Sequence, residues 1–147
     1  MRSAATVPPE REYHRLFLGP AKPVAPPFES VYADGAAFGP AAVGFLAELR
    51  EAGLELSVDF RLPPDHVAVQ LEYLACLERR AEEASASGDS GAATAWRARS
   101  RAFADGHLAR WLPPFLRRLE TSAPGSPYTF LVRAAARAAG VVLPGEP

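Results

Sequence analysis

Hydrophobic residues recur at helical spacing along most of the chain, and one stretch that follows two prolines is apolar on nearly every side. Pro63 and Pro64 end an extended run, and the carboxylate of Asp65 can then accept from the free N–H groups of a first helical turn. Only two polar side chains interrupt residues 67–77. Because a helix that is apolar all round is surrounded by other elements, we expect a central helix with Asp65 and His66 at its start.

Five shorter helical patterns flank this central helix. Proline or a capping residue marks most of their starts, and Gly53 and Gly140 mark two of their ends. In the pattern that opens at Pro40, the expected inward stripe is Val43, Leu46 and Leu49. The five patterns are Glu10 to Leu18, Pro40 to Gly53, Asp89 or Ser90 to Phe103, His107 to Leu119, and Ser126 to Gly140.

Two features of the second half of the chain interrupt its helical pattern. Asp105 and Gly106 predict a break between two helices. Pro113 and Pro114 then fall inside a broad amphipathic face, so this segment is either kinked or divided into two pieces that restart near Leu112. Trp111 and Phe115 lie on that face and are expected in the core.

Residues 54–60 alternate strictly between apolar and polar, which is a strand pattern. The sequence holds no second run of this kind, and a lone strand has no ladder to join. We interpret the segment as an extended connector that lays Leu54, Leu56, Val58 and Phe60 on the helices. Pairing with the same segment of a second copy is the alternative.

These patterns predict an all-α fold, a single-domain bundle of about six helices. The length of 147 residues suits one domain with its own core. We expect a disordered lead at 1–9, the helical domain at 10–140 and a C-terminal tail at 141–147. No run approaches the ~18 apolar residues of a membrane span, and residues 1–9 lack the apolar core of a secretory signal, so no membrane span and a cytoplasmic location are expected.

The distribution of charge is more informative than the net charge of −1, which argues against a nucleic-acid binder. Residues 1–78 carry six basic and eleven acidic side chains, a net charge of −5, whereas residues 79–147 carry ten and six, a net charge of +4. Either a cationic partner is drawn to the first half, or both halves are simply solvated faces.

The residues that could carry catalytic or metal chemistry are few and scattered. His14, His66 and His107 are the only histidines, and no metalloprotease motif or glycine-rich phosphate loop accompanies them. Gly-Asp-Ser-Gly at 88–91 lies in a polar loop without a preceding strand, which argues against a serine hydrolase. Cys76, the only cysteine, fits a small core residue, and His107 fits a packed, hydrogen-bonded histidine. No catalytic residue, metal site or cofactor is therefore expected.

Four motifs follow one another in a fixed order. They are Glu12 to Pro20 (EYHRLFLGP), Pro26 to Tyr32 (PPFESVY), Pro64 to His66 (PDH) at the start of an apolar helix, and His107 to Pro113 (HLARWLP) with Phe115. This ordered set resembles the TorD/DmsD/NarJ family of chaperones that mature molybdenum-containing oxidoreductases, and the similarity runs from about Glu10 to Gly140.

The resemblance implies an all-helical cytoplasmic chaperone, not an enzyme. Such a protein binds the twin-arginine signal peptide, or another part, of a molybdopterin oxidoreductase catalytic subunit until its cofactors are in place. Carried over by motif, the peptide-binding residues are Phe28, Ser30, Val31, Tyr32, Pro63, Pro64, Asp65 and His66, with Glu72 as a weaker candidate. The rival interpretations are a weak GTP-binding or hydrolysing domain and a purely structural assembly subunit.

The chain departs from the family pattern at its start. Family members usually carry further helices before the Tyr-x-x-Leu-Phe-x-Gly-Pro motif, whereas twelve residues precede Tyr13 here. We therefore expect a bundle that lacks the family's N-terminal helices and part of one wall. Either a partner chain covers the apolar strip, as a homodimer or domain-swapped dimer, or the chain is a shortened member with different client contacts.

Overall fold

The described residues, 8–19 and 22–143 of the computed structural model, are mostly helical, which confirms the all-α fold. Within them no β-strand forms, and one isolated antiparallel bridge joins Phe28 to His66. The helices are α1 (Pro9–Tyr13), α2 (Glu29–Ala33), α3 (Pro40–Glu51), α4 (Val67–Ala86), α5 (Ser90–Phe103), α6 (Ala109–Ser122) and α7 (Pro127–Ala138), with π-helical turns at η1 (His14–Leu18) and η2 (Ala104–Leu108).

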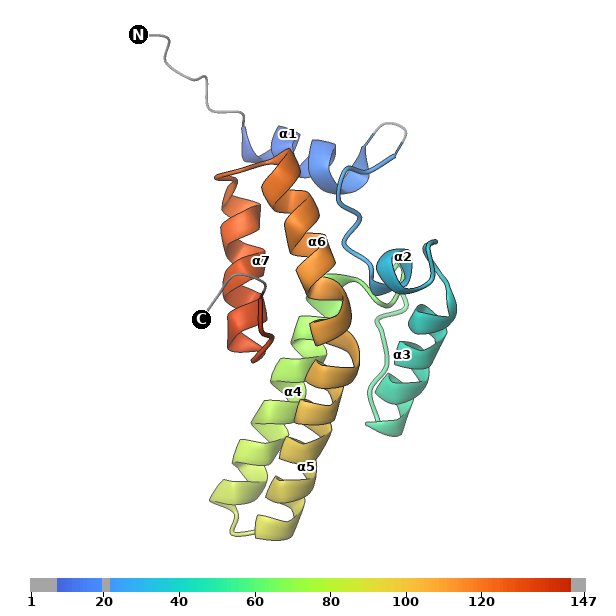
Figure 1. Ribbon diagram of the computed structural model, residues 1–147. Helices are drawn as coiled ribbons and strands as arrows, with labels where there is room; N and C mark the ends of the chain where they lie inside the picture. Colours follow the sequence, from blue (N-terminus) through green and yellow to red (C-terminus); the bar gives the residue numbers. More distant parts are fainter. Residues whose placement is uncertain (1–7, 20–21, 144–147) are drawn as a thin grey trace, which may run out of the picture.

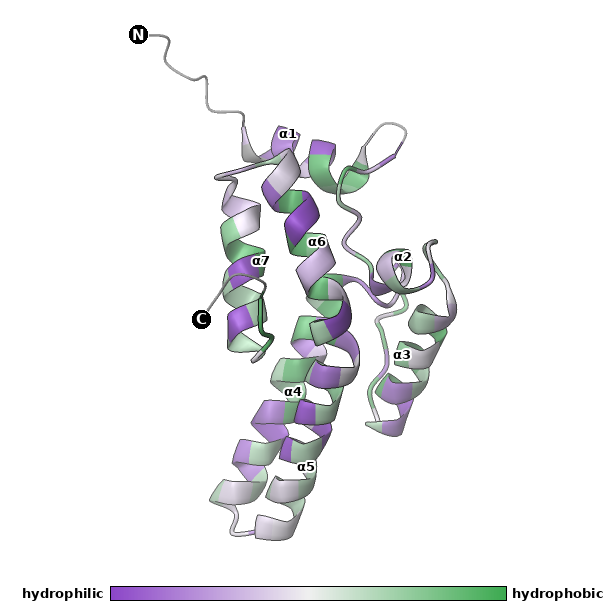
Figure 2. Cartoon of the chain, viewed as in Figure 1, coloured by the Kyte–Doolittle hydropathy of each residue, from purple (hydrophilic) through white to green (hydrophobic). Residues whose placement is uncertain are grey.

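The central helix α4 pairs along its length with α5 in an antiparallel hairpin, the lower arm of the molecule in Figure 1. Asp89 caps α5 by accepting a hydrogen bond from the N–H of Ala92 at 2.9 Å, as the sequence indicated. Figure 2 shows hydrophilic residues interleaved with apolar ones on this arm. The predicted all-round burial of α4 is wrong even in its first half, where Gln70, Tyr73 and Leu77 are buried while Ala68, Glu72 and Ala75 are exposed.

The break predicted at Asp105 and Gly106 is wrong. The chain passes from α5 through the π-turn η2 into α6, and the three elements form one long curved rod in Figure 1. A π-turn accommodates one extra residue without interrupting the helix, so a glycine can stay inside it. Pro113 and Pro114 likewise lie within the single helix α6, which excludes the two-piece alternative.

The remaining helices cover this rod. In Figure 1, α7 runs beside α6, α1 crosses its upper end, and α2 with α3 lies on the opposite side from α7. The predicted ends at Gly53 and Gly140 are confirmed: both have positive φ, 69° and 71°, and the following residue donates back to the helix, Leu54 to Leu49 and Val141 to Ala136, each at 2.9 Å.

One aromatic and aliphatic core joins these layers. Trp111 and Phe115 of α6 are buried as predicted, and they pack with Leu16 and Phe17 of η1 and with Tyr73 of α4. Val141 and Leu143, placed by the sequence analysis in a C-terminal tail, are also buried in this core. The predicted disordered lead at 1–9 falls largely outside the described residues.

Two predicted stripes are each wrong at one residue, since Leu46 and Leu49 of α3 and Leu54 and Leu56 of the connector do pack in or against the core. On α3 the buried residues are Ala42, Phe45 and Leu49, whereas Val43 is 64% exposed. In the connector, a turn at Ser57, closed by the Phe60 N–H at 2.9 Å, leaves Val58 87% exposed. The alternating pattern predicted a straight segment, whereas the turn carries Val58 away from the helices and returns Phe60 to a pocket that α4 also lines.

None of the described helices is both long and apolar enough to cross a membrane.

Candidate functional site

The segment before α2 lies against the start of α4, and backbone hydrogen bonds fasten the two. Val67 donates to the carbonyl of Pro27 at 2.9 Å, and Glu29 donates to the carbonyl of Asp65 at 3.2 Å. The rings of Phe28 and His66 meet edge to face at 5.2 Å between centroids. Two motifs that are far apart in the sequence thus form one junction, called here the α2–α4 junction (residues 27–32 and 63–67).

Asp65 caps a different helix from the one predicted. Its Oδ2 accepts from the N–H of Ser30 at 2.6 Å, in the first turn of α2. The first turn of α4 is capped by His66, whose Nδ1 accepts from the N–H of Ala68 at 3.1 Å. The two prolines place Asp65 one residue too early to reach its own helix, so the carboxylate crosses to its neighbour.

Asp65 and Ser30 are fully buried, each with no exposed surface. The Asp65 Oδ1 and the Ser30 Oγ have no hydrogen-bond partner among the described residues. Unpaired buried polar atoms are rare and point to a site that another group completes. The family resemblance places Asp65 among the peptide-binding residues, but in this conformation its carboxylate is closed off from solvent.

Burial also sets the protonation of the flanking rings. It lowers the pKa of His66, an effect that the nearby Asp65 charge opposes, so the imidazole is neutral at pH 7. Burial raises the pKa of Tyr32 to about 12, against the opposing charge of Arg118, whose guanidinium lies 5.2 Å from the centre of the Tyr32 ring. The junction therefore offers uncharged rings around one buried carboxylate.

An apolar hollow of about 160 Å³ opens beside the junction, and its surface is almost entirely carbon. Its lining comes from η1 and α1, from the start of α4, and from α6 and α7. Leu131 on its rim is 65% exposed. The lining residues are Tyr13, Phe17, Pro27, His66, Val67, Phe115, Tyr128, Leu131 and Val132.

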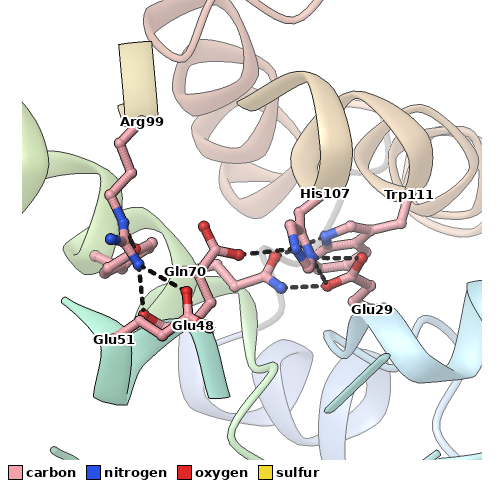
Figure 3. A network of polar contacts seen from close by, with 8 residues as sticks. Glu29, Glu48, Glu51, Gln70, Arg99, His107 and Trp111 are labelled. Atoms are coloured by element: carbon pink, nitrogen blue, oxygen red, sulfur yellow. Dashed lines mark hydrogen bonds and ion pairs between the residues drawn. The ribbon is translucent and has the colours of Figure 1, made fainter. Parts of the chain in front are cut away.

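On the inner side of the junction, a polar network joins the five elements α2, α3, α4, η2 and α6 (Figure 3). His107 of η2 donates from Nδ1 to the Glu29 carboxylate at 2.8 Å and from Nε2 to the Glu48 carboxylate at 3.1 Å. Gln70 of α4 donates to Glu29 and accepts from the Trp111 indole N–H at 2.8 Å. Glu29 and Gln70 are 4% and 0% exposed, so the network is part of the interior.

His107 is a cation at neutral pH. Burial lowers its pKa, but the hydrogen bonds and charges of Glu29 and Glu48 outweigh burial and raise the pKa to about 9. Only the doubly protonated ring can donate to two carboxylates at once. The expectation of a packed, hydrogen-bonded histidine is confirmed, although its partners were not foreseen.

The structure brings most of the predicted peptide-binding residues together and separates one. Pro63 and Pro64 are buried beneath the α2–α4 junction, and Val31 and Tyr32 are half-buried on α2. Glu72 is exposed, and it lines a separate pocket of about 340 Å³ with Phe60, Cys76 and residues of the connector. Its carboxylate therefore belongs to a different part of the surface from His66.

Sequence reasoning missed Glu29 and Glu48 as partners of His107, and Gln70 as a partner of Glu29. Gln70 left a signal, because it interrupts an otherwise apolar helix, and a polar side chain in such a place needs a buried partner. Glu29 stood inside an aromatic motif but was not singled out. Among the described residues, no group of three or more His, Cys, Asp or Glu side chains could hold a metal ion.

Comparisons with known proteins agree with the motifs. The family model described as "Nitrate reductase delta subunit" matches residues 4–117. The selenate reductase assembly chaperone protein of Thauera selenatis is 46% identical over 70 residues, which cover 46% of this chain and 34% of that protein. The chaperone protein TorD of Vibrio cholerae serotype O1 (strain M66-2) is 35% identical over 104 residues, covering 70% and 46%.

The matched segments span less than half the length of these two curated relatives. No solved structure matches the chain significantly. The family model covers most of the chain, including every motif on which the resemblance rests. The chain therefore belongs to the nitrate reductase delta subunit family, to which the NarJ- and TorD-type chaperones belong.

Proposed function

We propose that this chain is an assembly chaperone that binds an apolar segment of an immature molybdopterin oxidoreductase, either the twin-arginine signal peptide or another part of the catalytic subunit. It holds that segment while the cofactor is inserted, before export or assembly. The names of the two relatives, a selenate reductase assembly chaperone and TorD, support a role in assembly rather than in catalysis. The cytoplasmic location remains a prediction.

The observation that carries this proposal is the apolar hollow beside His66. Its carbon surface, formed by the rings of Tyr13, Phe17 and Tyr128 among others, fits an apolar side chain and offers no counter-ion. The half-exposed rim at Leu131 extends the apolar surface outward. A peptide anchored there by an apolar residue would run past the α2–α4 junction.

The arginines of such a peptide could bind only if the α2–α4 junction opens. Asp65 can pair with a guanidinium only when Phe28 and His66 separate, because the carboxylate is fully buried in the closed junction. The unpaired Asp65 Oδ1 and Ser30 Oγ are the acceptors that such an arginine would satisfy. We therefore assign the hollow to the apolar part of the peptide and the opened junction to its positive charge.

Calorimetric titration with a twin-arginine signal peptide tests this assignment. Leu131→Ser should weaken binding about tenfold, because it removes an apolar contact worth about 1–2 kcal/mol. The matched control is Val58→Ser, which alters an even more exposed apolar residue that lies outside the hollow. Equal loss in both variants, or no binding by the wild type, would contradict the proposal. Heat from GTP instead of the peptide would favour the nucleotide-binding alternative.

A further inference from the structure

The polar network in Figure 3 and the peptide site share one short element, α2. Glu29 lies between Phe28 and Ser30, two residues of the proposed site, and is fixed on both sides. Its backbone N–H donates to the carbonyl of Asp65, and its side chain reaches the opposite way to His107 and Gln70. A helix of five residues has almost no stability of its own, so these ties decide where α2 lies.

We propose that Glu29, His107 and Glu48 are positioning residues that hold α2 closed on the start of α4 and so set the geometry of the peptide site. This inference rests on the proposed function. His107 stands on η2, Glu29 on α2 and Glu48 on α3, so one imidazolium joins both covering helices to the central rod. None of the three side chains needs to touch the bound peptide.

The network also connects α2 with both α4 and α6. Gln70, one turn after His66, receives the Trp111 N–H and donates to Glu29. The Trp111 ring in turn lies 5.7 Å from that of Tyr32, another site residue on α2. Displacement of α2 would therefore break its hydrogen bond to Gln70 of α4 and its ring contact with Trp111 of α6.

A buried ion network is a poor way to gain stability alone. Removing charges from water costs several kcal/mol per ion, and an apolar replacement of similar shape is often at least as stable. A hydrogen-bonded network does fix the orientation of its side chains, because a hydrogen bond weakens steeply when its donor and acceptor move out of line. Its location directly behind the site fits a role in orientation better than a role in bulk stability.

The groups that face His107 come from every neighbouring element. Glu29 contributes a negative charge from α2 and Glu48 one from α3, whereas the rings of Phe45 and Phe103 cover its faces without charge. Arg99 of α5 donates to the backbone carbonyl of Glu48 at 3.0 Å, which ties α3 to the rod at a second point. These two carboxylates raise the pKa of His107 to about 9 against the effect of burial, and so keep the imidazole protonated at neutral pH.

His107→Gln tests the proposal, because glutamine is neutral and can donate to only one of the two carboxylates. His14→Gln, at an exposed histidine on η1 outside the network, is the matched control. Amide hydrogen exchange of Ser30 and Val67 reports directly on the closed junction, since both N–H groups are donated across it. In His107→Gln these two amides should exchange at least about tenfold faster, while those of the α4–α5 arm around Leu77 keep their rates.

Peptide affinity gives the second measurement. His107→Gln should bind the signal peptide about tenfold more weakly or less selectively at pH 7. Between pH 7 and pH 10 the wild-type affinity should change as His107 loses its proton, and the affinity of the variant should not. If His107→Gln does not fold, Glu48→Gln keeps the Glu29 pair and should show the same changes in weaker form.

The outcomes separate the two proposals. Unchanged exchange at Ser30 and Val67, or equal acceleration throughout the protein, would overturn the positioning role whatever the peptide does. Failure of the wild type to bind any client segment would overturn the proposed function, whereas selective acceleration at the junction would still establish the clamp on α2.

Discussion

The two ends of α4 pack on the same helical rod, but their interfaces consist of different kinds of residues. Hydrogen-bonded polar side chains form one interface, and small apolar side chains form the other. At the first end, Gln70 and Tyr73 are buried against α6 and α5, and each forms a side-chain hydrogen bond. At the other end, Ala81 of α4 and Ala93 of α5 are each 1% exposed, and the guanidinium of Arg80 lies 4.9 Å from the centre of the Trp96 ring.

This difference distinguishes the end of α4 that supports the fold from the end that carries the proposed peptide site. Small residues such as Ala81 and Ala93 let two helices approach closely and need no hydrogen-bond partner. Buried polar groups are costly unless they are paired, and their partners must be in place simultaneously. A helix that concentrates them at one end indicates where geometry matters more than stability, which here is the end that carries the α2–α4 junction.

The largest expected effect comes from the indoles at the two ends. Trp111→Ala should lower the free energy of unfolding by about 3–5 kcal/mol, because it leaves a large cavity and an unpaired Gln70 oxygen. Trp96→Ala should cost about 1–2 kcal/mol, because that ring is only half-buried. Urea denaturation of both variants measures the two values, and similar values would remove the distinction between the ends.

The pH dependence of stability should come next in size. The pKa of His107 is raised from 6.5 to about 9 in the folded protein, so its contribution is complete below pH 6.5 and is lost as pH rises to about 9. At about 1.4 kcal/mol per pKa unit, the loss can reach about 3 kcal/mol. Denaturation at several pH values between 6 and 9.5 should show this decline in the wild type and not in His107→Gln.

His14→Gln serves as the control for that measurement, since an exposed histidine outside the network should leave the pH profile unchanged. A wild-type protein equally stable at pH 6.5 and pH 9.5 would show that His107 is not held as a cation between the two carboxylates.

The parts of the fold that sequence reasoning predicted depend on local rules. Proline and cap residues at Pro40, Asp89 and Ser126 start helices, and glycine at positive φ ends them, because neighbours within a few positions satisfy the free backbone groups. The burial of Trp111 followed from its place on a broad apolar face. Family motifs brought Phe28 and Ser30 to the same junction as Asp65.

The parts that it missed depend on partners distant in the chain. Val43 and Phe45 both fit a helical stripe on α3, and only the position of Tyr73 and Phe103 decides that Phe45 faces inward. The direction of the Asp65 carboxylate likewise depends on α2, which lies 35 residues earlier. Periodicity gives the face of an isolated helix, whereas these choices need the neighbouring helix to be in place.

Smaller losses of stability are expected at the two aspartates that cap helices, Asp65 at the α2–α4 junction and Asp89 at the tip of the arm. Asp65→Ala should cost about 1–3 kcal/mol, because it leaves the buried N–H of Ser30 unpaired, whereas Asp89→Ala at the exposed tip of the arm should cost about 1 kcal/mol or less. Asp65→Asn keeps an acceptor and should stay close to the wild type in stability. Thermal unfolding of the three variants is the measurement, and a larger loss for Asp89→Ala would reverse the assignment.

The smallest expected effect on stability concerns the outer face of α7, where Phe130 and Leu131 are 64% and 65% exposed. Leu131→Ser should change the free energy of unfolding by less than about 0.5 kcal/mol, since an exposed side chain loses little on replacement.

The same change should be visible in association, because an apolar face that no described helix covers favours contact with another chain. We expect the wild type to self-associate at micromolar concentration in light scattering when no peptide is present, and Leu131→Ser to shift that association to higher concentration. Saturating signal peptide should also dissociate the wild type if the peptide occupies the same hollow, since both occupants then compete for Leu131. A wild type that stays monomeric at high concentration would exclude a second copy as an occupant, and self-association that peptide does not affect would place the two contacts on different faces.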